Sequence, residues 1–114
     1  MIAKPGENIH VITRRNFEGE LRRHFVGKII EMFETTARIE GHLYIFNSVD
    51  SQFVRIPKER TTIVDLAESG YIVTIIPPEV VIDHLRYELS DQGKLIATDN
   101  QGFSLDIHEF GANR

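Results

Sequence analysis

The segment from Phe25 to Phe46 constrains the fold more than any other part of the sequence. Two strand-like runs flank a short polar break at residues 34–36, and this pattern predicts a long β-hairpin. From Ala37 onward the second run alternates between two faces, as a strand in a sheet does. The two faces are expected to carry Ala37, Ile39, Gly41, Leu43 and Ile45 on one side, and Arg38, Glu40, His42, Tyr44 and Phe46 on the other.

Gly41 lies in the middle of this second run. A glycine inside a strand lowers its stability and usually marks a bulge, a bend or a close approach of two backbones. We therefore expect the hairpin to bend at Gly41, as a small barrel requires in order to curl on itself.

The flanking segments predict short strands and one ambiguous element. Strands are expected at residues 9–13, 52–56, 61–66 and 71–76. Phe17, Leu21 and Phe25 recur at every fourth position, which favours a short helix over residues 16–24, and a strand running into the hairpin is the alternative. The run at 71–76, YIVTII, is apolar on both faces, so it needs cover on both sides, from its own domain or from a neighbouring subunit.

The sequence changes character after Pro77 and Pro78. Residues 78–85 predict a turn or two of helix. Turn sequences at 91–93 and 99–102 then separate three short strands, expected at residues 87–89, 94–98 and 103–107. We expect a three-stranded meander in a C-terminal extension (78–114), appended to a barrel core (16–77) within a single domain of residues 1–114.

Length and composition agree with one ordinary globular domain. The chain has 114 residues, of which 41% are hydrophobic and 26% are charged, enough to bury a single core. No apolar run approaches the roughly 18 residues of a membrane span, and the first ten residues lack the apolar stretch of a secretory signal. A cytoplasmic location is the resulting expectation. Without cysteine, the chain forms no disulfide and no thiolate metal site.

Charge is unevenly distributed along the chain. Residues 1–60 hold ten Lys and Arg against eight Asp and Glu, whereas residues 61–114 hold three against nine, for a total net charge of −4. Such asymmetry is compatible with an anion-binding face, with head-to-tail contact of subunits, or with an ordinary mixed surface.

Sequence motifs for catalysis are missing. The five histidines show no ligand spacing, and there is no nucleophile motif and no glycine-rich phosphate loop. We therefore expect no cofactor and no metal, and we can assign no catalytic residue. An enzyme remains the lowest-ranked alternative.

A set of basic and aromatic residues is the best candidate for binding. Arginine clusters bind phosphates, and aromatic residues on strands stack on bases. The set comprises Arg14, Arg15, Arg22, Arg23, His24, Lys28, Arg38, His42, Tyr44, Phe46 and Arg55. However, an acidic chain lacks a general attraction for nucleic acid, and such residues are also common on the outside of barrels.

The middle of the chain, residues 16–77, resembles the Sm-like family. FEGELRRHFVGKIIEM is similar to the family's N-terminal helix and first strand, RIEGHLYIFN to its glycine-bent second strand, and TTIVDLAESGYIVTIIP to its last two strands. The resemblance implies a mainly β fold: a bent, five-stranded Sm-like or SH3-like barrel with a short N-terminal helix, carrying here an appended C-terminal β-meander. It also implies rings that form through the strands at 61–66 and 71–76 and that usually bind RNA.

The RNA-contacting motifs of the family are altered here. Asn47 stands nearest to its aspartate, Ser51 falls where its asparagine contacts RNA, and the Arg-Gly pair is replaced by Ser69-Gly70. The candidate binding residues are Tyr44, Phe46, Asn47, Asp50, Ser51, Arg55, Ser69 and Gly70. We predict a non-enzymatic homo-oligomeric binding or scaffold module with weak RNA binding at most. The alternatives are a protein-interaction barrel without nucleic acid and, last, a small-ligand enzyme with sites between subunits.

Overall fold

The computed structural model describes residues 2–13, 23–47, 49, 52–68 and 70–107. The chain divides into two compact units, Met1–Pro78 and Glu79–Arg114. Each unit contains one antiparallel sheet, and the described residues form no helix beyond a short 3-10 turn. Among these residues, no helix has the length and hydropathy needed to cross a membrane.

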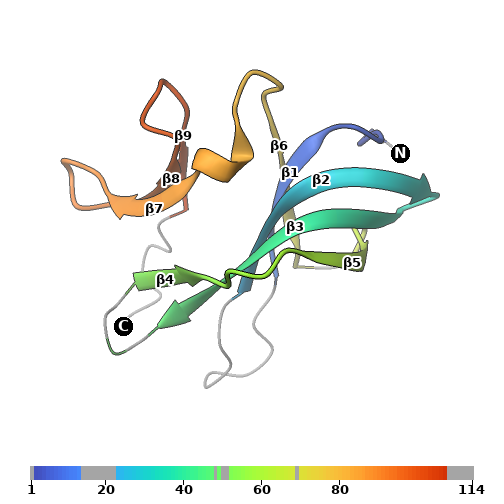
Figure 1. Cartoon of the computed structure of the whole chain (residues 1–114), viewed down its shortest axis with the longest axis horizontal. Helices are drawn as coiled ribbons and strands as arrows, with labels where there is room; N and C mark the ends of the chain where they lie inside the picture. Colours follow the sequence, from blue (N-terminus) through green and yellow to red (C-terminus); the bar gives the residue numbers. More distant parts are fainter. Residues whose placement is uncertain (1, 14–22, 48, 50–51, 69, 108–114) are drawn as a thin grey trace. The chain divides into compact units, whose positions relative to one another are not determined.

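The first unit is a six-stranded antiparallel sheet (Figure 1). Its strands are β1 (Asn8–Ile12), β2 (Arg23–Phe33), β3 (Thr36–Asn47), β4 (Gln52–Arg55), β5 (Arg60–Asp65) and β6 (Ile72–Ile76). Five of them follow the order β4-β3-β2-β1-β6, and β5 pairs with β3 beside that path. β1 is therefore an interior strand of the sheet, because it pairs with both β2 and β6.

The predicted hairpin is confirmed as β2 and β3, the two long curved strands in Figure 1. Its turn places Glu34 at a φ of 53°. Across the hairpin Gly41 lies opposite Gly27. A Cβ atom added at Gly41 would lie 2.5 Å from the Cα of Gly27, and it would collide with the carbonyl oxygen of Val26. The expected close approach of two backbones at Gly41 is thus present.

At Gly41 the second neighbour of β3 also changes. Residues 36–41 pair with β5, whereas residues 44–47 pair with β4. One long strand therefore belongs to two diverging parts of the sheet, which is how a bent strand begins to wrap a core. Closure into a complete barrel is not shown, since the pairing of the described residues links β5 only to β3 and β6 only to β1.

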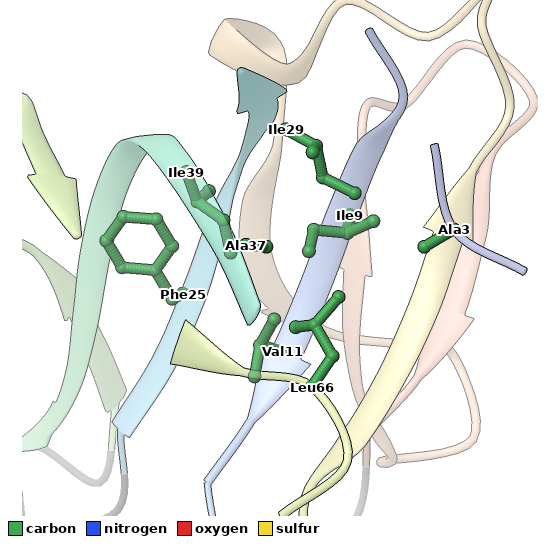
Figure 2. Packing of buried hydrophobic residues seen from close by; sticks show 8 residues of the cluster. All are labelled: Ala3, Ile9, Val11, Phe25, Ile29, Ala37, Ile39 and Leu66. Carbon is green, nitrogen blue, oxygen red and sulfur yellow. The ribbon is translucent and has the colours of Figure 1, made fainter. Parts of the chain in front are cut away.

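The core lies on one face of this sheet, as the alternation of β3 predicts. Ala37 and Ile39 on β3 are fully buried and pack with Ile9 and Val11 from β1. Figure 2 shows the buried cluster, which consists of Ala3, Ile9, Val11, Phe25, Ile29, Ala37, Ile39 and Leu66. Burying an Ile, Val, Leu or Phe side chain contributes about 1.5–3 kcal/mol, so this cluster stabilises the unit.

A β-bulge interrupts the pairing of β2 with β3. Ile29 pairs with Ile39, but the next pair joins Glu31 to Arg38, so Ile30 is the extra residue. The bulge shifts the alternation of β2 by one position, and Met32 lies opposite Ala37 and packs against the core. Arg38 and Glu31 then meet on the outside, where Nη1 of the arginine lies 2.6 Å from Oε1 of the glutamate.

The second unit contains the predicted meander. A 3-10 turn at Ile82–His84 precedes β7 (Arg86–Leu89), β8 (Leu95–Thr98) and β9 (Ser104–Asp106), which pair antiparallel in chain order. Gly93 and Gly102 both have positive φ, as the expected turns require. Thr98 stabilises the second turn, since its hydroxyl donates a hydrogen bond to the carbonyl of Phe103 at 2.6 Å and accepts one from the amide of Asn100.

The expected N-terminal helix is not supported where it can be examined. His24 belongs to β2, which begins at Arg23, so the hydrogen bonds at this end of the predicted segment are those of a sheet. Residues 16–22 of that segment lie outside the described residues. The alternative, a strand that leads into the hairpin, agrees with residues 23 and 24.

Candidate functional site

An open pocket of about 580 Å³ lies on the core face of the first unit. It is lined by Val11, Thr13, Arg23, Phe25, Leu43, Ile45, Arg60, Thr62, Ile63, Val64, Asp65 and Tyr71. The volume lies within the range of small-molecule sites, about 300–1,000 Å³. Leu43, Val64 and Tyr71 pack against the buried cluster while remaining half-buried. One side of the pocket is thus continuous with the apolar core, and polar and charged side chains complete the lining.

The arrangement of strands accounts for the pocket. β5 and β6 are joined by a short connection, yet each pairs with a different strand. Val64 on β5 shares the core face with Ala37, to which it pairs, and Val11 on β1 occupies the same face. The walls therefore come mainly from four strands, β1, β2, β3 and β5.

Two arginines give the pocket its charge. Arg60 pairs with Gly41, and Arg23 pairs with Ile45, so the register places both arginines on the core face of their strands. Both residues are exposed. A third charged residue is Asp65, whose carboxylate is fixed by hydrogen bonds within the protein. Its Oδ1 accepts from the hydroxyl of Thr35 at 2.9 Å and from the amide of Ala67 at 3.0 Å.

The opposite face of the sheet carries a cluster of histidine and aromatic side chains. The ring centroids of His10 and His24 are 5.1 Å apart, and the ring centroid of Phe53 lies 4.4 Å from that of His24. Phe46 continues the row with a centroid distance of 5.4 Å to Phe53. Both His10 and His24 are only 1% exposed. Burial lowers the pKa of His10 to about 4, so the imidazole is neutral at physiological pH.

Arg55 belongs to this outer face as well. It pairs with Tyr44, and its Nη2 lies 3.0 Å from Nε2 of His42. The guanidinium is therefore partly engaged within the sheet. Tyr44 is only 4% exposed. A buried ring offers no platform for base stacking, so Tyr44 is better explained as packing.

The structure describes only some of the candidate binding residues. Tyr44, Phe46 and Arg55 gather on one face of β3 and β4, and the backbone of Asn47 ends β3. Gly70, with a φ of 87°, lies in the connection between β5 and β6. Asp50, Ser51 and Ser69 lie outside the described residues. These candidates remain predictions.

Sequence reasoning missed the two features with the most definite geometry. The pocket was not predicted because the sequence places Arg60 in a charged turn. Only the pairing of Arg60 with Gly41 shows that this arginine lies on the core face. Burial of His10 and His24 was also not foreseen, since alternation separates the two faces of a strand but does not reveal whether the polar one is covered. Within the described residues, no group of three or more possible metal ligands is brought together.

No family model matches the chain, and neither curated proteins nor solved structures gave a match. The fold and site define a small, all-β, antiparallel protein with an open pocket lined by both apolar and polar side chains.

Proposed function

We propose that the protein is a non-enzymatic binding or scaffold module that assembles with copies of itself through β5 and β6. The observation that carries this proposal is the pair of open sheet edges. In the described part of the chain β5 pairs only with β3 and β6 only with β1. Open edges offer rows of backbone donors and acceptors to another strand.

Apolar side chains near these edges support the proposal. Ile63 on β5 is 65% exposed and Ile72 on β6 is 59% exposed. Ile75, also on β6, is 41% exposed. An apolar edge that stays uncovered promotes aggregation, so a partner strand from a second copy would both pair the backbone and remove these side chains from water.

An Sm-like arrangement is the finer form of this proposal. In its favour are the glycine-bent β3 and the short connection between β5 and β6. Strands that resemble β5 and β6 close the ring between neighbouring subunits in that family. A difference is the additional strand β1, which lies between β2 and β6.

Light scattering coupled to size-exclusion chromatography tests the assembly. We expect the wild-type chain to elute as an oligomer and Ile72→Lys to dissociate it, because a lysine at the edge would be desolvated in the interface. Leu89→Lys is the matched control: Leu89 is 68% exposed but lies in the second unit, and its variant should keep the oligomer. A wild-type chain that remains monomeric at high concentration contradicts the proposal.

A further inference from the structure

We propose that the pocket in the first unit binds a small amphiphilic carboxylate, with its apolar chain inside and its head group at Arg60 and Arg23. The proposal goes beyond self-assembly, because every lining residue belongs to a single first unit. It rests on three observations: an open pocket with an apolar side, two arginines on the core face of its wall, and the internal hydrogen bonds of Asp65.

The apolar part of the pocket favours a ligand with a hydrocarbon chain. Val11, Phe25, Leu43, Ile45 and Val64 supply aliphatic and aromatic surface from four strands. A flexible hydrocarbon chain adapts to such a wall and gains the free energy of leaving water, about 0.8 kcal/mol for each buried CH₂ group. Against these five residues a polar chain would leave hydrogen bonds unmade.

The arginines specify the head group. Neither Arg23 nor Arg60 has a side-chain ion pair within the described residues. Both arginines are exposed, so a ligand that enters from solvent can reach them. A guanidinium binds a carboxylate through two parallel hydrogen bonds, which gives both geometry and charge compensation.

Asp65 contributes the one negative charge of the lining. Its Oδ1 is occupied by Thr35 and by the amide of Ala67, so the carboxylate is held in the turn that follows β5. With two arginines and one aspartate in the lining, the pocket has a net positive charge. A compact, singly charged carboxylate fits this balance, and an ammonium head group of equal chain length does not.

Isothermal titration calorimetry with octanoate, octanol and octylamine tests the proposal. We expect octanoate to bind at least about tenfold more tightly than octanol, the effect of a charge-assisted hydrogen bond, and octylamine to bind least. Arg60→Gln should weaken octanoate binding about tenfold while leaving octanol unchanged. Arg23→Gln provides a second variant at the same wall.

Lys28→Gln is the matched control, since it removes one positive charge from the other face of β2. It should bind octanoate like the wild type. Amide shifts in a ¹⁵N NMR titration should appear at Val11, Phe25, Leu43 and Val64. Octanoate that binds no better than octanol, or equally in Arg60→Gln, overturns the proposal, as does a complete lack of binding at millimolar concentration. Ile72→Lys should retain octanoate binding, which separates this site from the assembly.

Discussion

Gly27 and Gly41 face each other across the β2–β3 ladder. At both positions the backbone of the facing strand lies where a Cβ atom would be. A Cβ atom at Gly27 would lie 2.6 Å from the carbonyl oxygen of Glu40 and 2.7 Å from Cγ2 of Ile39. Because the obstacles are largely backbone, they cannot rotate away as a side chain does. The bend of the hairpin thus depends on a matched pair of glycines.

Gly41→Ala should destabilise the first unit because of this contact. We expect a loss of about 2 kcal/mol or more in the free energy of unfolding, as for overpacked core sites. Urea denaturation followed by circular dichroism measures it. Glu40→Val, at the neighbouring exposed position, is the control and should stay within about 0.5 kcal/mol of the wild type. If Gly41→Ala proves as stable as the control, the close approach is not required.

Acid should destabilise the protein through His10. In the unfolded chain the imidazole binds a proton below its ordinary pKa of 6.5, whereas in the folded protein burial lowers the pKa to about 4. The unfolded state therefore binds more protons between these values, and stability falls as the pH falls from 6.5 to 4. The full effect is about 3 kcal/mol.

His10→Phe tests this pH dependence, since it keeps an aromatic ring and removes the titrating group. Denaturation midpoints measured between pH 7 and 4 should show a shallower slope than in the wild type. The carboxyl of Asp99 contributes at lower pH, because hydrogen bonds from the amides of Gln101 and Phe103 lower its pKa below 3.8. An unchanged slope in His10→Phe would assign the acid sensitivity to other groups.

Thr98→Val should weaken the second unit alone. The hydroxyl of Thr98 is buried and makes hydrogen bonds with Phe103 and Asn100. Removing it leaves the carbonyl of Phe103 without this donor, at a cost of about 1–2 kcal/mol. Hydrogen exchange should accelerate in β7, β8 and β9, with little change in β2 and β3. Thr61→Val, at an exposed site on β5, should have no comparable effect in either sheet.

Binding to uridine-rich single-stranded RNA should be weak and sensitive to salt. The net charge is −4, Tyr44 is buried, and Arg55 is engaged by His42, so phosphate contacts would provide most of the affinity. Fluorescence anisotropy at several salt concentrations measures it. Submicromolar binding that persists at about 0.15 M salt and disappears in Asn47→Ala would reveal a specific site instead.

The sequence predicted the local elements well because their signals are local. The alternation from Ala37 onward identified the core face of β3, and the turns around Gly93 and Gly102 delimited the meander. Gly41 stood out because a glycine inside an apolar strand needs a steric reason.

Features that depend on pairing between distant strands were harder to predict. Nothing in the run around Ile9 indicates that β1 lies between β2 and β6. The pocket was invisible for the same reason, since its walls combine Val11, Phe25 and Val64 from three separate strands. Periodicity assigns a residue to a face, but only the register determines which residues meet across it.

The bulge at Ile30 defines where the length of this hairpin can change. Deleting a residue from a strand normally reverses the faces of everything beyond it. At Ile30 the outcome differs, because Ile29 already pairs with Ile39 and Glu31 with Arg38. Loss of Ile30 would leave both flanking registers intact and convert the kinked ladder into a regular one. An evolving lineage could therefore gain or lose this residue, and with it the local twist, without rebuilding the core.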